Sequence, residues 1–552
     1  MKIQSIGRWD REVTLVAQLA AAASLLAFLF YFRHRDLLLY GDAVAHINIA
    51  RRVFDSRTPG LLQLGTVWLP LPHLLMIPFL LSDSGWQTGI GGAIPSMCAY
   101  VFGVVGMFRL VRGVLSGSAA PEPSARIAAW LAAAIYAANP NLLYLQTTAM
   151  TESIYLALFV WAVVHFSEFV QAANPTKADA RLAGPSLVKC GWCLAGACLT
   201  RYDGWLLAVV IGLAALFVIA RARGASMRGS FSKFVLLAAA APVLWLGYNA
   251  IVYHNPLEFA NGPYSARAIE RKNATPGMTA HPGSHDLPAA SSFFLKSAQL
   301  NVVEGNWGRL WLGLLLAGTL ASLGFLRQTW PLLLFWVPLP FYILSVAYGG
   351  VPIFLPVWWP FSYYNTRYGL ELLPAFVVFV AISVHFLFGL ARNKSTRTSV
   401  GLAFALLLVG SYVAVWRALP ICYREAHANS RTRMAFEAEL AVNLGLLPHD
   451  STLLMYLGDH VGALQRAGIP LRRVINEGNH RPWQHPSDPE GLWEKALANP
   501  RENVDYVVAM DGDPVASAVQ KRDLTSVVVI KTTGQPRATF YWTHRSDGNH
   551  TR

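Results

Sequence analysis

Residues 11–32 read REVTLVAQLAAAASLLAFLFYF, and residues 40–43, shortly after them, read YGDA. The first stretch is apolar and close to the roughly 20 residues that a helix needs to cross the hydrocarbon core of a bilayer. Basic residues precede it and no small-residue cleavage site follows, so we expect a retained membrane anchor rather than a removed signal peptide. An acidic residue, Asp42, therefore lies ten residues beyond the first predicted span.

Ten further apolar runs predict about eleven transmembrane helices in total. The runs lie at residues 88–110, 125–145, 149–171, 187–202, 204–220, 234–253, 306–326, 330–348, 369–390 and 399–418. Of the 552 residues, 54% are hydrophobic and 14% are charged, whereas soluble domains carry about 25% charged residues. This composition excludes an ordinary soluble protein and a disordered chain, and five cysteines are too few for a disulfide scaffold.

The net charge of +14 belongs to the membrane part. Residues 1–419 hold 30 Lys/Arg against 16 Asp/Glu, and residues 420–552 hold 15 against 15. The cations sit at the ends of apolar runs, where they set orientation against anionic lipid, so no nucleic-acid partner is indicated. The positive-inside rule places the N-terminus in the cytoplasm, and loops 33–87 and 254–305 and the tail on the outer face of an inner or plasma membrane.

Two regions differ from plain spans and connectors. In the first outer loop, 43–54 predicts a short amphipathic surface helix, and 68–81 is apolar but interrupted by proline, as in an interfacial or re-entrant segment. The tail 420–552 alternates strand and helix patterns, which predicts a small α/β domain. Its expected strands are 451–457, 471–475, 504–510, 526–531 and 538–542, and its expected helices are 462–467, 492–498 and 514–521.

Asp42 is the first candidate for chemistry. It lies at the start of the predicted helix that also carries His46, Asn48, Arg51 and Arg52. Aspartate suits a helix N-cap, so capping is one alternative role, and pairing with the nearby arginines is another. A capping aspartate can also be catalytic, so these alternatives stay open.

Further ionisable residues interrupt apolar segments at the same predicted outer depth. They are Glu152 in MTES, Arg201 and Asp203 in LTRYDG, and Arg367 in NTRYG with Glu371 one turn deeper. Ionisable groups near membrane depth are functional candidates, because leaving them unpaired in hydrocarbon is costly. The alternatives are that Glu152 caps a helix after Thr151, that Arg201 and Asp203 neutralise each other, and that Arg367 snorkels. Together these residues could bind an anionic head group and a hydroxyl acceptor.

At these residues the chain resembles the GT-C superfamily of membrane glycosyltransferases, which use polyprenyl-phosphate-linked sugars. It is similar to the branch of aminoarabinose transferases and protein O-mannosyltransferases over most of residues 1–390. The resemblance rests on the segments already quoted together with WLPLPH at 68–73 and Pro374. One position departs from the pattern: Ala43 follows Asp42, where the mannosyltransferases have an Asp-Glu pair, which weakens the case for protein O-mannosylation.

The resemblance implies a polytopic α-helical GT-C-like membrane domain, residues 1–419. The α/β domain predicted from the pattern of the tail, residues 420–552, is expected to be extracytoplasmic. It implies that Asp42 is the catalytic base and Glu152 the second acidic position, and that Arg201 and Arg367 bind the lipid phosphate. The expected substrate-binding set is completed by His46, His73, Tyr202, Asp203 and Tyr368. The implied partners are a polyprenyl-phosphate sugar donor and an acceptor that is lipid, glycan or protein. Glu152 would orient the acceptor or hold a divalent metal ion, so the need for a metal stays open.

Chemistry supports an inverting transferase. A carboxylate can remove the acceptor proton, and the phosphate leaves as a stable anion without a general acid, so one base and direct attack are sufficient. A second class is a transporter or lipid-linked-sugar flippase, but the sequence shows no internal repeat. A third is a non-catalytic scaffold.

Two further motifs do not indicate a second site. The CxxC at 190–193 lacks the thioredoxin-like context that a redox site would need. His281, His285 and Asp286 favour a mobile loop over the acceptor entry rather than a metal site.

Overall fold

The computed structural model describes residues 10–116, 122–173, 180–222, 227–273, 280–324, 329–391, 393–458, 460–479, 491–520, 522 and 524–543. The chain forms two compact units, each made of segments that are far apart in sequence. The first unit consists of Met1–Arg35, Pro95–Trp245 and Pro263–Glu425, and the second of Asp36–Ile94, Leu246–Gly262 and Ala426–Arg552. The domain boundary expected after residue 419 stays a prediction.

The first unit is helical. Its elements are α1 (Arg11–Arg33), most of α5 (Ile90–Leu115), α6 (Glu122–Ala137), α7 (Pro140–Leu145), α8 (Glu152–Ala172), α9 (Ala180–Cys198), α10 (Asp203–Ala222), most of α11 (Arg228–Tyr253), α13 (Ala266–Asn273), α14 (Leu287–Val302), α15 (Trp307–Gly324), η3 (Trp330–Trp336), α17 (Pro338–Tyr348), η4 (Thr366–Leu372), α18 (Leu373–Leu390) and α19 (Lys394–Ala418). Every apolar run expected to span the membrane forms a helix in this unit.

Eight segments of the described chain are long and apolar enough to cross a membrane. The predicted runs at 125–145, 187–202 and 306–326 form α6, α9 and α15, which are helical but not among those eight. The prediction of a multi-pass membrane protein is therefore confirmed, with three of the eleven expected helices shorter or less apolar than the rest.

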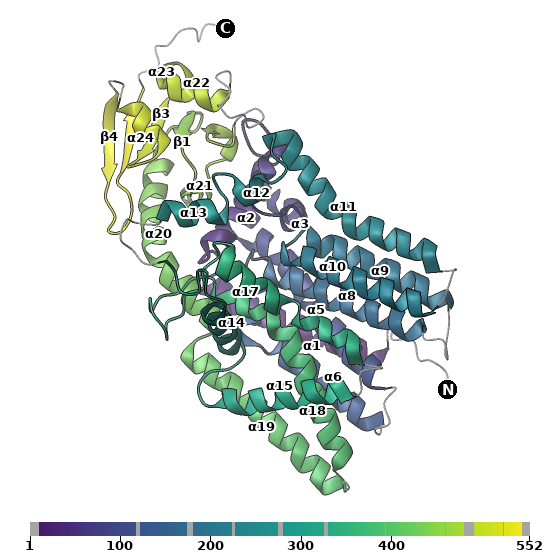
Figure 1. Cartoon of the computed structure of the whole chain (residues 1–552). Helices are drawn as coiled ribbons and strands as arrows, with labels where there is room; N and C mark the ends of the chain where they lie inside the picture. The colour runs from purple at the N-terminus through teal and green to yellow at the C-terminus, as the bar shows by residue number, and fades with distance from the viewer. Residues whose placement is uncertain are drawn as a thin grey trace. The chain divides into compact units, whose positions relative to one another are not determined.

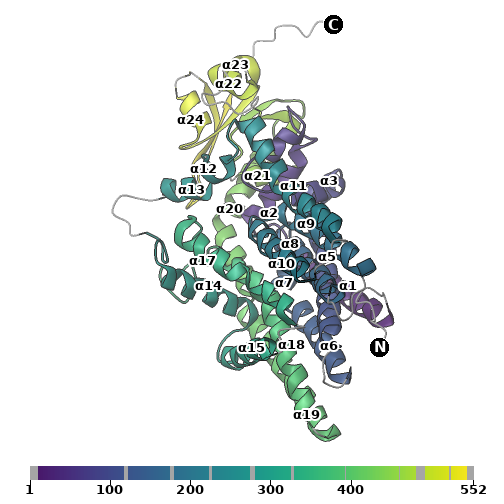
Figure 2. The same ribbon diagram turned by 45° about the vertical axis from the view of Figure 1, so that its right-hand side comes forward.

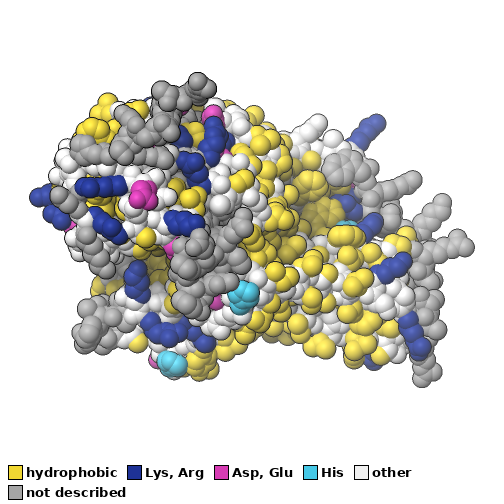
Figure 3. Space-filling model, turned by 90° about the horizontal axis from the view of Figure 1, so that it is seen from above, with side chains coloured by type: hydrophobic (Ala, Val, Ile, Leu, Met, Phe, Trp, Pro, Cys, Tyr) yellow, Lys and Arg dark blue, Asp and Glu magenta, His cyan; other side chains and the backbone are white. Residues whose placement is uncertain are grey.

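Helices α8, α9 and α10 lie side by side in both ribbon views (Figure 1 and Figure 2). In the span that begins at Glu152, 72% of the residues in its most apolar stretch are buried. In the corresponding stretches of the α10 and α11 spans, only 28% of the residues are buried. The exposed side chains of α10 and α11 are large and apolar, for example Leu213 and Leu244. Figure 3 shows hydrophobic side chains over much of the visible helical surface. Such a surface is suited to lipid rather than water.

The second unit combines the first outer loop with the tail. Its helical elements are α2 (Gly41–Arg52), η1 (Leu61–Leu64), α3 (Leu71–Leu80), α4 (Asp83–Thr88), α12 (Glu258–Asn261), most of α20 (Ile421–Gly445), α21 (Val461–Ala467), η5 (Leu471–Arg473), α22 (Leu492–Ala498), α23 (Pro500–Asn503) and α24 (Pro514–Val519). Helix α2 forms as predicted, but the expected surface position is wrong because most of its side chains are buried. Part of the reason is that Asn48 donates a hydrogen bond to Gln465 in the tail, at 2.7 Å.

The tail contains the predicted α/β arrangement. Strands β1 (Leu453–Met455), β2 (Val474–Ile475), β3 (Tyr506–Met510), β4 (Thr525–Ile530) and β5 (Ala538–Trp542) form one sheet. The strand order is β2-β1-β3-β5-β4: β1 pairs in parallel with β2 and β3, and β5 pairs antiparallel with β3 and β4. All five strands and three helices occur where expected. Residue 521, the expected end of one helix, lies outside the described residues.

Candidate functional site

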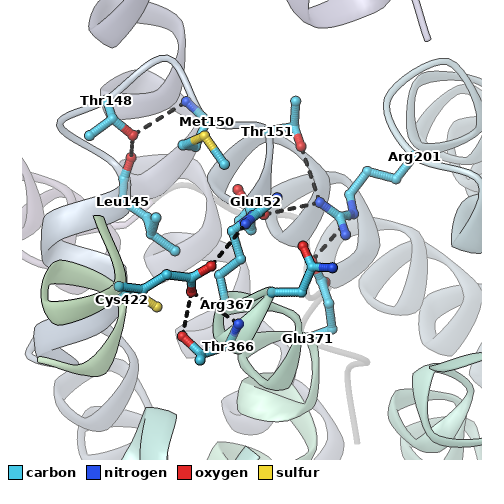
Figure 4. A network of polar contacts seen from close by, with 12 residues as sticks. Leu145, Thr148, Met150, Thr151, Glu152, Arg201, Thr366, Arg367, Glu371 and Cys422 are labelled. Carbon is cyan, nitrogen blue, oxygen red and sulfur yellow. Dashed lines mark hydrogen bonds and ion pairs between the residues drawn. The ribbon is translucent and has the colours of Figure 1, made fainter. Parts of the chain in front are cut away.

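Glu152 lies at the centre of a buried polar network in the first unit (Figure 4). It is the first residue of α8, Thr151 is the N-cap residue, and the Glu152 side chain has no exposed surface. Its Oε1 atom lies 3.1 Å from Nη1 of Arg201 and 3.2 Å from Nε of Arg367. A first-turn glutamate favours the positive end of a helix dipole, but here one carboxylate also joins two arginines from distant parts of the chain.

Arg201 lies in the short connection between α9 and α10, and only 13% of its side chain is exposed. Its Nη1 donates to the hydroxyl of Thr151 and to Glu152, both at 3.1 Å, and its Nη2 donates to the hydroxyl of Tyr342 at 2.6 Å. A guanidinium group has five N–H donors in a rigid plane. These contacts therefore fix the orientation of Arg201.

Asp203 and Glu371 lie on another side of Arg201. The Nε atom of Arg201 is 3.5 Å from Glu371 and 3.7 Å from Asp203. Asp203 also accepts a hydrogen bond from Tyr342 at 3.0 Å. Glu371 is fully buried, and neither of its carboxylate oxygens accepts a hydrogen bond from the described residues. The expected mutual neutralisation of Arg201 and Asp203 is therefore one contact in a larger network.

Arg367 is held from the opposite side by Glu425. The two side chains approach to 3.3 Å, and Glu425 also accepts a hydrogen bond from the backbone N–H of Thr366 at 3.0 Å. Asn365, just before Thr366, adopts the left-handed conformation, with φ 54°, which asparagine tolerates better than most residues. Arg367 is 7% exposed, so it is a paired residue inside the protein and not a snorkelling one.

The network holds more acid than base. Its carboxyl groups are Glu152, Asp203, Glu371 and Glu425, and its guanidinium groups are those of Arg201 and Arg367. Four carboxyl groups against two guanidinium groups give a formal charge of −2 if all are ionised. Such a buried cluster can accept protons, hold hydroxyl groups and present rigid N–H donors.

The aromatic members of the predicted site behave differently. The ring of Tyr368 lies under both guanidinium groups, 5.2 Å from the Cζ of Arg201 and 5.1 Å from that of Arg367. The Tyr202 hydroxyl accepts a hydrogen bond from Trp245 at 3.2 Å, and its ring packs against Trp205. Tyr368 is thus part of the network's wall, whereas these two tryptophan contacts of Tyr202 indicate packing.

Glu425 and Tyr342 were not predicted from the sequence. Glu425 lies just beyond the last apolar run, where adjacent charged residues such as Arg424 and Glu425 are typical of an ordinary interfacial segment. Tyr342 lies inside an apolar run, where tyrosine is common. Only the pairing of elements far apart in the chain shows their roles.

Asp42 belongs to the second unit. It is the second residue of α2, whose N-cap is Tyr40, so Asp42 is not itself the cap. The neighbouring Arg51 pairs with Asp55 at 2.8 Å and with Asp83 at 2.7 Å. The carboxylate of Asp42 lies in the first turn, where the helix dipole favours it. A single cavity that joins Asp42 to the network of the first unit stays a prediction.

His46 and His73 form a buried pair in the same unit as Asp42. Nδ1 of His46 lies 2.8 Å from Nε2 of His73, and the ring of Trp68 packs on His46 with centroids 4.6 Å apart. Burial, followed by the neighbouring His46 and Arg52, holds the pKa of His73 well below its usual range. Since His46 follows Asp42 by one helical turn, the pair lies on the face of α2 that carries the aspartate.

No group of three or more His, Cys, Asp or Glu side chains in the described ranges is arranged to hold a metal ion. In the loop 254–305, His281 pairs with Glu270 at 3.0 Å, and Asp286 caps α14 by accepting from the N–H of Ala289. His281 thus has a carboxylate partner, and Asp286 has a capping role.

The fold is similar to two crystal structures of ArnT from Cupriavidus metallidurans, one bound to undecaprenyl phosphate and one in the apo state. Their TM-scores are 0.57 and 0.56 at 14% sequence identity, and each match covers 96% of this chain and 98% of the ArnT chain. The chain has the ArnT fold. This confirms the polytopic fold that the GT-C resemblance implied.

A weaker structural match is the oligosaccharyltransferase AglB from Archaeoglobus fulgidus, in complex with an inhibitory peptide and a dolichol-phosphate. Its TM-score is 0.46 at 15% identity, and the match covers 98% of this chain and 75% of AglB. No protein-family profile matches the chain. No curated protein matches it in sequence.

Proposed function

We propose that this protein is an inverting glycosyltransferase that moves a sugar from a polyprenyl-phosphate-linked donor to an acceptor on the outer face of the membrane. The proposal has the N-terminus in the cytoplasm and the tail outside, in an inner or plasma membrane. The nearly full-length likeness to ArnT, which was crystallised with undecaprenyl phosphate, supports a lipid-phosphate donor. The acceptor is a lipid, a glycan or a protein.

The position of the network along the helices carries the proposal. Glu152 and Asp203 are the first residues of two candidate spans, and Arg367 is the second residue of a third. Arg201 contacts both Glu152 and Asp203, and Glu152 also contacts Arg367. Three spans therefore begin at one polar cluster. Transporters place their binding site near the bilayer midplane, between broken helices. A cluster at the ends of spans suits a reaction at the membrane surface better than passage through the membrane.

In the proposed reaction, Asp42 accepts the proton of the acceptor hydroxyl, and the hydroxyl oxygen forms a bond to the anomeric carbon. The bond from that carbon to the phosphate oxygen breaks, and the lipid phosphate leaves with the electron pair. Attack from the opposite side inverts the anomeric configuration. Arg201 and Arg367 bind the phosphate, and Glu152 orients the acceptor. Because Glu152 and Glu425 already fix the arginines, the site need not reorganise when charge develops.

The test uses the purified full-length protein in detergent with a panel of polyprenyl-phosphate sugars, and measures both released lipid phosphate and transferred sugar. Asp42→Asn should abolish transfer, because the amide cannot take the proton. Asp83→Asn is the matched control: it makes the same substitution in the same outer loop at an exposed side chain, and it should keep the activity.

Full transfer by a folded Asp42→Asn variant would exclude the assigned base. A flippase would instead move lipid-linked sugar across proteoliposomes without releasing lipid phosphate. That result would replace the transferase proposal with the transporter class.

A further inference from the structure

The backbone that leads into Asp42 is held by an arginine of the tail. Residues 34–40 join α1 to α2 as turns and irregular backbone, and irregular backbone inside a protein needs partners for its carbonyl groups. The carbonyls of Leu38 and Leu39 each accept a hydrogen bond from Nη2 of Arg433, at 2.9 Å. Arg433 lies in α20, 395 residues after Leu38. All of these residues from Leu38 onward belong to the second unit, together with Asp42.

Arg433 is itself held in one orientation. Its side chain is only 12% exposed, and its Nη1 donates to both carboxylate oxygens of Glu437, each at 2.8 Å. Glu437 is buried one turn further along α20, and a Cβ added at Gly462 in α21 would collide with its carboxylate. A guanidinium group is planar and its donors have fixed directions. Fixing Nη1 on Glu437 therefore also fixes the Nη2 group that faces the backbone of the first outer loop.

The start of α2 is defined by contacts from neighbouring elements. Its N-cap residue, Tyr40, makes no side-chain capping hydrogen bond, although such a bond commonly stabilises the first turn of a helix. A Cβ added at Gly89, at the end of α4, would lie 2.8 Å from Cδ2 of Leu38, and one added at Gly41 would lie 3.9 Å from Nε of Arg433. The segment that precedes α2 is thus enclosed between α4 and α20.

This arginine differs from an exposed surface ion pair, which contributes little. It uses four N–H contacts, and two of them end on main-chain carbonyls shortly before Asp42. A general base must lie within hydrogen-bond reach of the proton that it removes. A misplacement of about 1 Å can lower a rate by about a hundredfold. A residue that sets where α2 begins therefore also sets where the carboxylate of Asp42 lies.

We propose that Arg433 is a positioning residue for Asp42. Through the carbonyls of Leu38 and Leu39 it holds the first turn of α2, and with it the carboxylate, in the place where the acceptor hydroxyl loses its proton. Glu437 contributes by orienting Arg433. This inference rests on the proposed function, because it takes Asp42 as the base. It gives the tail an effect on the reaction without a contact between Arg433 and the substrate.

The experiment uses the full-length protein in detergent and compares kcat with KM. Arg433→Gln should lower kcat about ten- to a hundredfold, and KM for the lipid-linked donor and for the acceptor should change less than about twofold. The reason is that Arg433 contacts the chain and not the substrate. Arg433→Lys keeps the charge but lacks the planar set of donors, so it should regain part of kcat. Arg431→Gln makes the same substitution at an exposed position of α20 and should keep kcat.

Amide hydrogen exchange gives a second measurement that needs no activity. Arg433→Gln should speed exchange in residues 38–45, because two carbonyls lose their partner, and Arg431→Gln should leave it unchanged. Where Arg433→Gln does not fold, Arg433→Lys and Glu437→Gln carry the test, and both should lower kcat and speed this exchange.

The outcomes separate this inference from the proposed function. If folded Arg433 variants keep the kcat of the unmodified protein, if Arg431→Gln loses as much, or if KM rises while kcat is unchanged, Arg433 does not position Asp42. Unchanged exchange in residues 38–45 would also overturn the proposal. If the unmodified protein transfers no sugar, the proposed function is wrong, and faster exchange in Arg433→Gln would still support a role of Arg433 in holding the segment that carries Asp42.

Discussion

The buried network shows which contacts of single residues can be predicted from sequence. Glu152, Arg201 and Arg367 interrupt apolar segments, and the cost of leaving such groups unpaired predicts that they find partners. The partners themselves depend on packing between elements far apart in the chain. Glu425 is 58 residues from Arg367, and no local pattern indicates that contact. The sequence therefore identified the charged core of the network but missed Glu425 and Tyr342.

Removing the central guanidinium group should destabilise the protein strongly. Arg201→Gln leaves Glu152, Asp203 and Glu371 without their shared cation, and breaking a buried ion pair in this way costs about 3–5 kcal/mol. Arg221→Gln, at the exposed end of α10, should cost less than about 1 kcal/mol. Thermal unfolding in detergent measures both. Equal melting temperatures for the two variants would contradict the central role of Arg201.

The buried histidine pair should make stability depend on pH. The pKa of His73 is below its usual range because burial, His46 and Arg52 disfavour its charged form. The unfolded chain therefore binds a proton more readily, at a pKa of about 6.5. The stabilising contribution is complete above that pH and is lost as the pH falls toward the folded-state pKa.

Melting temperatures between pH 7.5 and 5 test this expectation. The melting temperature of His73→Gln should fall less at low pH than that of the unmodified protein. His427→Gln, in α20, is a control whose melting temperature should fall as much as that of the unmodified protein. A His73→Gln profile parallel to that of the unmodified protein would argue against a buried neutral imidazole.

At the scale of elements, helix positions and strand positions were largely predictable. The tail strands are runs of apolar and β-branched residues bounded by turn residues, and all five form in one sheet. What could not be predicted is how closely elements approach. Gly318 in α15 is an example, because a Cβ added there would collide with the backbone oxygen of Phe379 in α18. Small residues permit such close helix packing in membranes.

Gly318→Ala should therefore lower stability, although alanine favours helices. We expect a loss of about 1–3 kcal/mol, the usual cost of overpacking. Gly313→Ala, in the same helix with nothing within 4 Å of the added Cβ, should be neutral or raise stability by up to about 1 kcal/mol. Thermal unfolding of the two variants gives the comparison. A Gly318→Ala variant as stable as Gly313→Ala would mean that α15 and α18 are not packed this closely.

At the scale of the whole molecule, each compact unit is made of segments that are far apart in the sequence. Residues 36–94 and the tail belong to one unit. Asn48 donates to Gln465, Gln465 donates to the carbonyl of Trp86 at 2.6 Å, and the Trp86 indole N–H donates back to Asn48 at 2.9 Å. The tail thus stabilises the helix that carries Asp42.

This closed set of hydrogen bonds can be tested without an activity assay. Gln465→Ala should increase amide hydrogen exchange in α2, because Asn48 and the Trp86 carbonyl lose a buried partner. Gln520→Ala, at an exposed position of the same tail, should leave exchange in α2 unchanged. Unaltered protection of α2 in a folded Gln465→Ala variant would show that the tail does not support this helix.

The same arrangement limits how the protein can be recombined with its structural relatives. In a chimera joined just after the last apolar helix, the first outer loop and the tail would come from different proteins. Asn48 and Trp86 of the loop would then lose Gln465, the partner that their own tail provides. Such a hybrid would need the outer loop and the tail to be transplanted together. The interchangeable part of this protein is therefore discontinuous in sequence.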